Sequence, residues 1–447
     1  MQIRRIVSLL LGGLIAGGTA LVMRERRRDT NAPALSGWPR VVVVGGGFGG
    51  LRVAQKLAGA PADVLLIDRH NYHCFQPLLY QVATAALEPE AIAYPIRRIL
   101  RGSPNARFRM AAVQRVCLEE RKLLTDEGPI DYDYLVLAAG STTNYFGNQP
   151  IAERSFGLKN LDEAVALRNH ILECFERASA EPDEARRAAL LTFVVAGGGP
   201  TGVEFAGALA ELIRLVLVHD YPGLDLKEAR VLLIEGGPAL LAAMAPSLQK
   251  EAQRALLQKG VEVRVNAQVK DVDAEAVYLA DGTVIRTNTL VWAAGVRATD
   301  IAKELGTPLG KGGRVRVEPT LQLADHPEVF VIGDLAYLED KGGALPMIAP
   351  VAIQQGNLVA ENIRRLIAGQ PLARFSYRDP GKMATVGRNA AVFEYGRLRL
   401  RGFLAWVMWL TVHLMQLVGF RNRLVVLVNW AWDYLFFDRA VRLISQR

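Results

Sequence analysis

The sequence predicts an α/β protein that contains two doubly wound domains of the Rossmann type. A chain of 447 residues is too long for one ordinary hydrophobic core, so we expect two or three domains. Two glycine-rich loops, Gly45–Gly50 and Gly197–Gly202, each follow an apolar strand and precede a helix. A further apolar strand, Val329–Ile332, ends in Gly333 and Asp334. These features indicate that one such domain is inserted into the sequence of the other.

The first glycine loop has the GxGxxG pattern. It follows Val41–Val44, a run of valines typical of a buried parallel strand. Gly45 makes a tight turn, Gly47 lets the backbone approach a pyrophosphate, and Gly50 lets the helix and the strand pack closely. The predicted helix Leu51–Leu57 then directs its free N–H groups and positive dipole end toward the phosphates.

An acidic residue follows the next strand of this unit. The apolar segment Asp63–Ile67 ends in Asp68, which is placed to accept hydrogen bonds from an adenosine ribose. Glycine-rich turns are common, so a turn without a ligand is the competing interpretation. Strand, loop, helix, strand and terminal acid in this order favour a dinucleotide site.

The same order of elements returns in the middle of the chain. An apolar strand at residues 191–196 precedes the loop, and a helix is predicted from Val203 toward Leu217. The next strand, Arg230–Ile234, ends in Glu235, after a crossover that Tyr221–Asp225 interrupts. A carboxylate at this position repels a 2′-phosphate, so we expect NADH rather than NADPH. The glycines of this second fingerprint are Gly197, Gly199 and Gly202.

Two phosphate loops require two nucleotides, normally a bound flavin and a diffusing nicotinamide. We assign FAD to the first loop because the strand before Asp334 resembles the one whose aspartate faces the ribityl–diphosphate in such folds, near a helix from Val351 onward. Tyr134–Gly140 and Leu290–Gly295 close the two nucleotide domains. The predicted segments are an apolar N-terminal segment (1–28), a linker (29–39), the FAD domain (40–158 and 296–370), the NADH domain (159–295), and C-terminal strands with amphipathic helices (371–447).

Composition excludes several classes of function. The net charge of +8 suits an anionic membrane surface, and no zinc spacing or recognition-helix pattern indicates nucleic acid. The three cysteines, Cys74, Cys117 and Cys174, form no CxxC pair, so we expect neither a disulfide framework nor a dithiol relay beside a flavin. No metal site is predicted.

Both ends of the chain favour a membrane. Ile6–Met23 is an uncharged run flanked by arginines, which is just long enough for a span and places the bulk of the chain in the cytoplasm; an interfacial or disordered leader is the alternative. Phe403–Phe420 and Leu424–Phe437 are apolar and rich in tryptophan, which favours an anchor at the headgroup level. A buried core or a homodimer interface is the competing interpretation. We expect His413 on a polar face rather than at a metal.

With these residues assembled, the chain resembles the type II NADH dehydrogenases, the single-subunit NADH:quinone oxidoreductases that do not pump protons. The resemblance runs from about residue 40 to the C-terminus and is carried by residues 71–83, Thr201–Glu204 and residues 382–390. It implies that Glu204 lies near the flavin between the NADH and quinone sites and that Lys382 approaches the quinone side. The family's quinone motif AQxAxQxG corresponds to Ala349–Gly356, where Pro350 replaces the first glutamine.

The resemblance implies hydride transfer from NADH to FAD and passage of two electrons to a membrane quinone, on the cytoplasmic face of a bacterial inner membrane. The residues expected at FAD are Gly45, Gly47, Gly50, Asp68, Arg69, Gln76, Ala139, Gly140, Gly333, Asp334 and Ala352. Those expected at NADH are Gly197, Gly199, Gly202, Glu235, Ala294 and Gly295. Those expected at the quinone are Pro350, Ile353, Gln354 and Gln355, with Glu204, Lys382 and Gln354 as catalytic residues.

Two alternatives remain open on the sequence. A sulfide:quinone-type or other flavin reductase shares the fold but, for sulfide, needs two cysteines at the flavin, and none occurs after Cys174. A non-catalytic FAD- and NADH-binding interaction protein would retain both glycine loops and lose quinone-site residues, and Pro350 is the feature that points to it.

Overall fold

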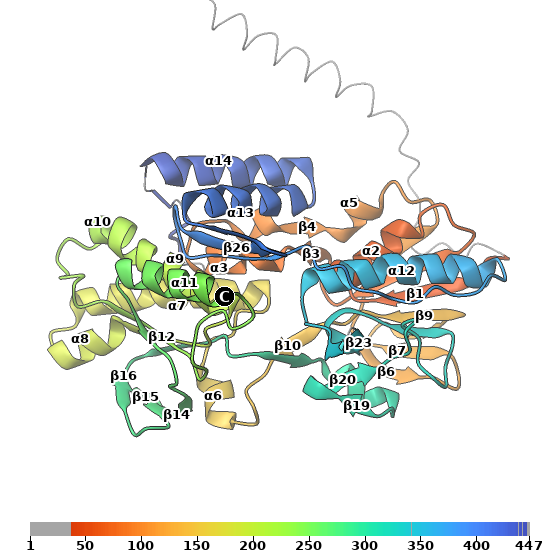
Figure 1. Ribbon diagram of the computed structural model, residues 1–447, viewed down its shortest axis with the longest axis horizontal. Coiled ribbons are helices and arrows are strands. Elements are labelled where there is room, and N and C mark those ends of the chain that lie inside the picture. Colours follow the sequence, from red (N-terminus) through yellow and green to blue (C-terminus); the bar gives the residue numbers. More distant parts are fainter. Residues whose placement is uncertain (1–36, 341, 437, 440, 445–447) are drawn as a thin grey trace, which may run out of the picture. The chain divides into compact units, whose positions relative to one another are not determined.

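The computed structural model describes residues 37–340, 342–436, 438–439 and 441–444 (Figure 1). The chain divides into two units, residues 1–38 and 39–447, and all the helices and strands of the described part belong to the second. The predicted N-terminal membrane segment, residues 6–23, lies outside the described residues.

The first nucleotide domain is built on a parallel sheet of five strands, in the order β21-β9-β1-β2-β5. The register pairs Val41–Val44 of β1 with Val64–Ile67 of β2 on one side, and with Tyr134–Leu137 of β9 on the other. Strand β21 comes from the late part of the chain and still joins this sheet, which confirms that the domain is discontinuous. The strands are β1 (Arg40–Val44), β2 (Asp63–Asp68), β5 (Ala106–Met110), β9 (Tyr134–Leu137) and β21 (Val329–Val331).

The second nucleotide domain has a parallel sheet of four strands, in the order β13-β12-β11-β17. Every side chain of β11 and β17 is buried, as expected for strands covered on both faces. This sheet is formed entirely by the inserted part of the chain, so the predicted α/β fold with two Rossmann-type domains is confirmed. Its strands are β11 (Thr192–Ala196), β12 (Arg230–Ile234), β13 (Val261–Arg264) and β17 (Thr289–Trp292).

The helix after each glycine loop begins earlier than predicted. Helix α2 spans Phe48–Lys56 and helix α9 spans Pro200–Glu211, so the third glycine of each fingerprint lies inside the first helical turn. The prediction started each helix after the glycines because glycine has a low helix propensity. Helix α9 then widens into the π-helical segment η2 (Leu212–Leu217) and does not continue as one α-helix to residue 217.

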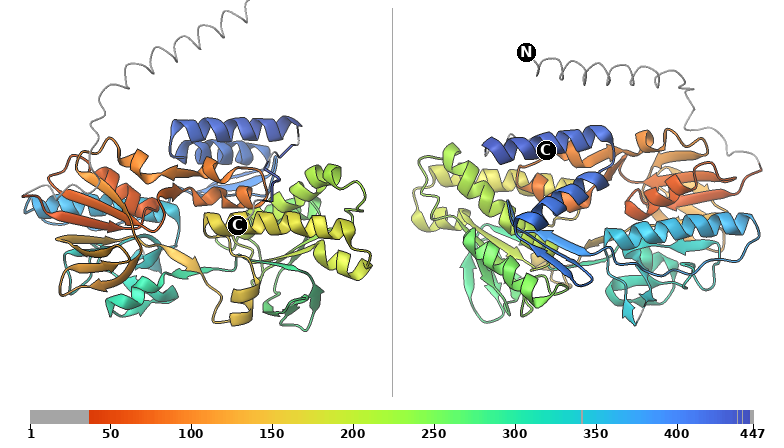
Figure 2. Two further views of the ribbon diagram at one scale, coloured as in Figure 1. Left: turned by 180° about the vertical axis from the view of Figure 1, so that it is seen from behind. Right: turned by 45° about the horizontal axis from the view of Figure 1, so that its top comes forward.

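The other helices and strands connect and cover the two sheets (Figure 2). The remaining helices up to residue 370 are η1 (Gln76–Leu78), α3 (Leu79–Ala83), α4 (Pro89–Ile92), α5 (Ile96–Leu100), α6 (Gln149–Arg154), α7 (Leu161–Ala180), α8 (Glu184–Leu190), α10 (Val218–Asp220), α11 (Pro246–Gln258), η3 (Asp300–Leu305), η4 (Lys311–Gly313), η5 (Gly333–Leu335) and α12 (Ala349–Ile367). The remaining strands of this part are β3 (Tyr72–Cys74), β4 (Ala93–Pro95), β6 (Val113–Cys117), β7 (Lys122–Thr125), β8 (Gly128–Asp131), β10 (Ser141–Thr143), β14 (Val269–Val272), β15 (Ala276–Leu279), β16 (Val284–Arg286), β18 (Val296–Ala298), β19 (Leu309–Gly310), β20 (Arg314–Arg316), β22 (Ala336–Tyr337), β23 (Glu339–Asp340) and β24 (Gly343–Ala344).

The C-terminal region consists of a small sheet and two helices. Strands β25 (Lys382–Thr385), β26 (Ala391–Tyr395) and β27 (Leu398–Arg401) form an antiparallel sheet. Helices α13 (Phe403–Gln416) and α14 (Phe420–Phe436) follow and lie against each other at one side of the nucleotide domains (Figures 1 and 2). None of the described helices combines the length and the apolar character needed to cross a bilayer.

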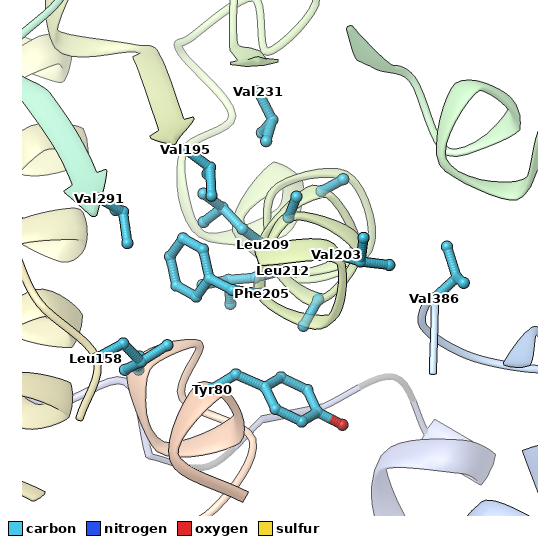
Figure 3. Close-up of a cluster of buried hydrophobic side chains, with 14 of the residues drawn as sticks. Tyr80, Leu158, Val195, Val203, Phe205, Leu209, Leu212, Val231, Val291 and Val386 are labelled. Carbon is cyan, nitrogen blue, oxygen red and sulfur yellow. The ribbon is translucent and has the colours of Figure 1, made fainter. Parts of the chain in front are cut away.

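Helix α9 lies at the centre of the largest hydrophobic core (Figure 3). Phe205 and Leu209 of α9 are fully buried, and this core joins them to Tyr80 of α3 and to Val386, which follows β25. The same core includes Trp409 of α13. Helix α9 therefore connects the second glycine loop, at its N-terminus, to the FAD domain and to the C-terminal region.

Candidate active site

The two glycine loops have the same geometry. Gly45 and Gly197 adopt φ values of +105° and +113°, which side chains other than glycine rarely adopt. A Cβ atom on Gly50 would lie 2.0 Å from the carbonyl oxygen of Gly45, and one on Gly202 would lie 1.9 Å from that of Gly197. Each loop thus requires its first glycine for conformation and its third for close packing.

The middle glycine of each loop faces open space that suits a pyrophosphate. A Cβ atom on Gly47 or Gly199 would meet no heavy atom within 4 Å. These residues are the N-caps of α2 and α9, and neither helix start has a side-chain cap on its N–H groups. Uncapped N–H groups at the positive end of a helix dipole bind phosphate. Both loops therefore fit the diphosphate of a dinucleotide.

The acid after the second strand of each unit holds the loop in place. Asp68 Oδ2 accepts the backbone N–H of Gly46 at 2.6 Å, and Glu235 Oε2 accepts that of Gly198 at 2.6 Å. The second oxygen of each carboxylate accepts an N–H two residues along the chain. Each carboxylate oxygen keeps a free lone-pair direction, so the predicted ribose contacts of Asp68 and Glu235 remain predictions.

The short segments that follow strands β9 and β17 lie beside the first and the second glycine loop, respectively. Ala139 and Ala294 lie beside the first glycine of their loops, within 3.3 Å and 2.7 Å of the position that a Cβ atom would take there. Gly140 and Gly295 follow them with φ values of +72° and +150°. The predicted residues of each set are thus close to their own loop.

Asp334 lies in a polar cluster with two residues that the sequence did not single out. Its Oδ2 accepts hydrogen bonds from Ser141 Oγ at 2.5 Å and Lys159 Nζ at 3.3 Å. The predicted residue Gln76 is exposed and donates to the carbonyl oxygen of Lys159 at 3.2 Å. Arg69 is exposed. The sequence analysis did not identify Lys159, because a single lysine in a loop belongs to no recognisable motif.

Helix α12 presents the segment that resembles the quinone motif. Pro350 occupies its first turn, where the missing N–H costs no helical hydrogen bond, so this replacement suits the helix. Ala352 lies against Gly333 and the first glycine loop. Ile353 is half-buried, and the side-chain amide of Gln354 is paired at both ends with the backbone of Arg378, at 2.8 and 3.1 Å.

Gln355 differs from its predicted place at the quinone. It is 1% exposed, and its Oε1 accepts the backbone N–H of Gly333 at 2.6 Å. The helical period turns this side chain inward, away from the face of Gln354. Gln355 therefore fixes the turn before Asp334 on the FAD side.

Glu204 is a buried carboxylate near the start of α9. Its Oε1 accepts hydrogen bonds from the backbone N–H of Thr385 in β25 and from the indole Nε1 of Trp409 in α13, both at 3.2 Å. Burial raises the pKa of Glu204 from 4.5 to about 8, although both hydrogen bonds lower it. The carboxyl group is thus poised between its two protonation states near neutral pH.

A polar chain from α14 ends beside Glu204. The indole Nε1 of Trp430 donates to Gln81 Oε1, and Gln81 Nε2 donates to the hydroxyl of Tyr80, each at 2.8 Å. Burial, and then the charge of Glu204, raise the pKa of Tyr80 well above its usual value. The sequence marked both tryptophans only as membrane-anchor residues, so this buried role was missed.

Two residues named from the sequence, His413 and Lys382, have well-defined partners in the structure. His413 is packed against the indole of Trp409, with ring centroids 4.0 Å apart, and its Nδ1 faces the carbonyl oxygen of Trp409 at 2.8 Å. Burial lowers the pKa of His413 to about 4. Lys382 lies on β25, but its exposed Nζ donates to the carbonyl oxygen of Ala243 at 2.8 Å.

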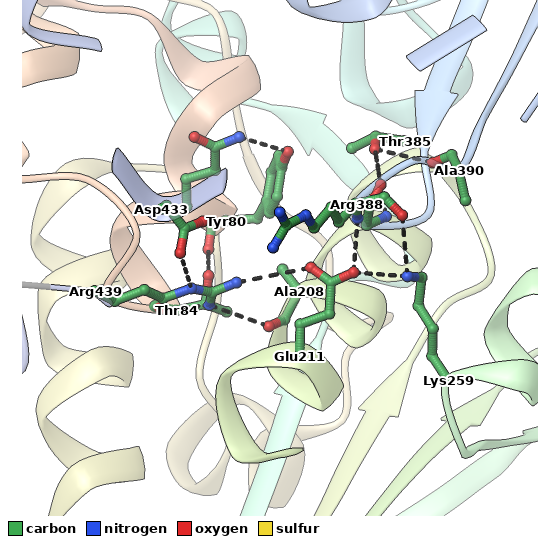
Figure 4. Close-up of polar contacts among 12 residues, drawn as sticks. Tyr80, Thr84, Ala208, Glu211, Lys259, Thr385, Arg388, Ala390, Asp433 and Arg439 are labelled. Carbon is green, nitrogen blue, oxygen red and sulfur yellow. Dashed lines mark hydrogen bonds and ion pairs between the residues drawn. The ribbon is translucent and has the colours of Figure 1, made fainter. Parts of the chain in front are cut away.

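A cluster of charged side chains surrounds Glu211, which is the last residue of α9 (Figure 4). Glu211 Oε1 accepts Lys259 Nζ and the backbone N–H of Arg388, each at 2.6 Å. Arg439, which follows α14, lies 3.8 Å from Glu211 Oε2 and donates to the carbonyl oxygens of Thr84 and Ala208 at 2.8 and 3.2 Å. This arginine, also missed, ties the end of the chain to α3 and α9.

The cysteines of the described chain do not form a redox pair. Cys74, Cys117 and Cys174 are all free. Burial raises the pKa of Cys74 in β3 to about 12, and that of Cys174 in α7 to about 11. These thiols stay protonated at neutral pH and are poor nucleophiles.

Two interlocked nucleotide domains with two phosphate loops define the class, the pyridine nucleotide-disulphide oxidoreductases, and that family matches residues 39–356. The NDH2 C-terminal domain matches residues 380–439. The type II NADH:quinone oxidoreductase Ndh of Mycobacterium tuberculosis is 41% identical over 91% of this chain and 90% of its own length. The internal alternative NAD(P)H-ubiquinone oxidoreductase A1 of Arabidopsis thaliana is 30% identical over 93% and 88%. The chain belongs to the type II NADH:quinone oxidoreductases.

Solved structures agree in fold. NDH2 of Plasmodium falciparum in complex with NADH has a TM-score of 0.84 at 18% identity, covering 91% of this chain and all of that chain. The sulfide:quinone oxidoreductase of Aquifex aeolicus has a TM-score of 0.64 at 18% identity, covering 89% and 95%. Family membership decides between these chemistries: FAD is the cofactor, and electrons pass from NADH to a quinone without proton pumping.

Proposed function

We propose that this chain reduces its quinone at a membrane surface, in the region where α9 and the C-terminal region meet, with Glu204 as the group that holds a proton there. The observation that carries the proposal is the position of Glu204. It lies on the helix that begins at the NADH loop, and its carboxyl group is bonded to β25 and α13 of the C-terminal region.

The residues around both nucleotides orient their ligands. FAD, when bound, supplies the two-electron redox chemistry that links NADH to the quinone. The first loop and Asp334, with Lys159 beside it, would hold the FAD diphosphate and ribityl chain. The second loop and Glu235 would hold NADH, and the charge of Glu235 disfavours a 2′-phosphate.

Proton supply is the task that a buried carboxyl group can perform at the quinone. Conversion of a quinone to a quinol takes up two protons with two electrons. With a pKa of about 8, Glu204 is mostly protonated at neutral pH and can give up its proton without a large energetic cost. Gln354 holds the backbone at Arg378, and Lys382 holds Ala243, so we propose positioning roles for both.

The C-terminal helices would provide the membrane contact. Two asparagines of α14 point inward: Asn422 donates to backbone oxygens at residues 90, 91 and 93, and Asn429 donates to Glu88. Their outer face is apolar, which is costly in water and suits the interfacial region of a bilayer. The large exposed apolar residues on these helices include Phe403, Leu404, Val407, Met415, Phe420, Leu424, Leu427, Val428, Trp432, Leu435 and Phe436.

Anaerobic stopped-flow mixing tests the role of Glu204. In Glu204→Gln, NADH should bleach the flavin at the wild-type rate, while reoxidation by a short-chain quinone should slow by about 10²-fold, the typical contribution of a general acid. Glu228→Gln, a half-exposed carboxylate of the NADH domain, serves as the control. Equal reoxidation rates in wild type and Glu204→Gln would refute the assignment.

Vesicle sedimentation tests the membrane face. Leu404 and Leu435 are 69% and 67% exposed, so glutamate at these positions leaves the core intact and should abolish binding to anionic lipid vesicles. Leu257→Glu, at a residue 53% exposed on α11, is the matched control and should bind normally. If Leu404→Glu and Leu435→Glu still bind vesicles but become monomeric, the apolar face is a homodimer interface instead.

A further inference from the structure

Helix α13 packs on the protein core along one face, where Trp406, Met408, Leu410 and Leu414 are partly buried. Ala405 and Trp409 are its only buried residues, and they lie four positions apart on one face. The opposite face carries exposed apolar residues such as Phe403 and Leu404. Trp409 is the largest fully buried side chain of the described residues, so it is the main anchor of this helix on the core.

The side chain of Trp409 reaches the buried carboxyl group of Glu204. Trp409 is 1% exposed, and its indole N–H donates to Glu204 Oε1 at 3.2 Å. The same oxygen accepts the backbone N–H of Thr385. An indole N–H is a donor only, so this bond favours the charged carboxylate over the neutral acid.

We propose that Trp409 is a positioning residue that couples the seating of α13 on the core to the protonation state of Glu204 during quinone reduction. The inference rests on the proposed function of Glu204. When α13 is seated, the indole bond stabilises the carboxylate that remains after Glu204 has given up its proton. When the indole moves away while the carboxyl group stays buried, that donor is lost and Glu204 retains its proton.

Glu204 Oε1 accepts one hydrogen bond from α13, through Trp409, and one from β25, through the backbone N–H of Thr385. Tyr80 and His413 are neutral at physiological pH because burial raises the pKa of the first and lowers that of the second. Glu211 is neutralised by Lys259 and lies near Arg439. The titratable and charged groups on the elements packed around Glu204 are Tyr80 on α3, Glu211 on α9, Lys382 on β25, His413 on α13, and Asp433 and Arg439 on and after α14.

The two faces of α13 would make the protonation of Glu204 sensitive to the membrane. Residues that lie outward, including Leu404 and Met415, are 69% and 62% exposed, whereas Trp409 points inward. Insertion of the outer face into lipid fixes the helix in one orientation, which keeps the indole at Glu204. We therefore expect quinone reduction to depend on pH differently with and without lipid.

The experiment replaces the indole N–H while keeping the side-chain shape. Incorporation of 3-benzothienylalanine at position 409 exchanges the N–H for sulfur, and Trp409→Phe serves as a second variant. The same analogue at Trp406, on the same helix and stacked on Tyr434 with ring centroids 5.5 Å apart, is the matched control. Both half-reactions are followed by anaerobic stopped flow from pH 6 to 9.

The analogue at Trp409 should leave flavin bleaching by NADH unchanged. It should raise the apparent pKa that governs reoxidation by a short-chain quinone by about one pH unit, as expected for one lost hydrogen bond to a charged group. The Trp406 analogue should leave this profile at its wild-type position. Wild-type enzyme bound to anionic vesicles should show a lower apparent pKa than enzyme without lipid.

Three outcomes would overturn the inference. The first is that the Glu204→Gln variant loses the pH dependence of reoxidation but the analogue at Trp409 leaves it unchanged. Trp409 would then have a packing role only. Equal shifts from the Trp406 and Trp409 analogues would show a general effect of the helix. An identical profile with and without vesicles would refute the coupling to lipid. If Glu204→Gln itself retains the wild-type profile, the proposed role of Glu204 fails separately.

Discussion

Replacement of Gly202 by alanine should slow NADH oxidation about 10²-fold and leave FAD in place. A Cβ atom at this position would lie 1.9 Å from the carbonyl oxygen of Gly197 and 3.1 Å from its carbonyl carbon. Both neighbouring atoms belong to the backbone of the NADH loop, so no side chain can rotate away to make room. The loop itself must move away from α9.

The size of the effect follows from the distance. Real Cβ atoms essentially never approach a heavy atom within 3.0 Å, so the gap must widen by about 1 Å. A displacement of that size in a substrate-positioning loop costs about 10²-fold in rate, equivalent to about 2.7 kcal/mol of transition-state stabilisation. Overpacking lowers the free energy of unfolding by a further 1–3 kcal/mol, roughly.

Steady-state kinetics and absorbance at the flavin band measure the two consequences. We expect kcat/KM for NADH to fall about 10²-fold and the FAD content of the purified protein to stay at the wild-type level. Gly223→Ala is the control, because a Cβ atom there meets no heavy atom within 4 Å. Wild-type kcat/KM in Gly202→Ala would refute the assignment of this loop to NADH, and loss of FAD would assign the flavin to it.

Gly50→Ala is the reciprocal test, since a Cβ atom there would lie 2.0 Å from the oxygen of Gly45 and should release FAD. Glu235→Gln removes the charge that repels a 2′-phosphate, so the ratio of kcat/KM for NADPH to that for NADH should rise about tenfold; an unchanged ratio in steady-state assays would place the selectivity elsewhere. Arg439→Met leaves buried carbonyl oxygens and carboxylates without their donor, so it should lower the free energy of unfolding by about 3 kcal/mol, and an unchanged denaturation midpoint would contradict this. Folding raises the pKa of Glu204 from 4.5 to about 8, so its contribution to stability is complete below pH 4.5 and is lost as the pH rises toward 8. The free energy of unfolding of wild type should therefore fall relative to Glu204→Gln by up to about 1.4 kcal/mol per pH unit in that window, and parallel pH–stability curves would show that Glu204 is not buried.

The nucleotide sites were largely predictable from sequence because their determinants are local. Gly50 packs against the backbone of Gly45, and Gly202 against that of Gly197, within a single turn. The spacing of these glycines in the sequence therefore predicts the shape of each loop. The buried strand before each loop is equally readable as a run of apolar residues. The predicted starts of the two helices were less accurate, because each first turn contains glycine, which has a low helix propensity.

The region proposed for the quinone was predicted only in part. The resemblance identified Glu204, and the structure adds its partners Thr385 and Trp409. Gln355 was expected at the quinone but turns inward, because neighbouring residues on a helix face directions about 100° apart and only α12's packing shows which is inside. The pairing of Gln354 with Arg378 was likewise invisible without the fold.

The sequence by itself determined the two Rossmann-type domains, the insertion of one into the other, the two nucleotides and the family. The two nucleotides rest on short patterns whose parts touch within one strand–loop–helix unit, and the insertion and the family rest on further short segments that can each be read locally. The tertiary structure alone decided which side chains meet from distant positions. Lys159 reaches Asp334 across 175 residues, Trp409 reaches Glu204 across 205, and Arg439 reaches Ala208 across 231. Such contacts depend on how whole elements pack, and no local spacing records that.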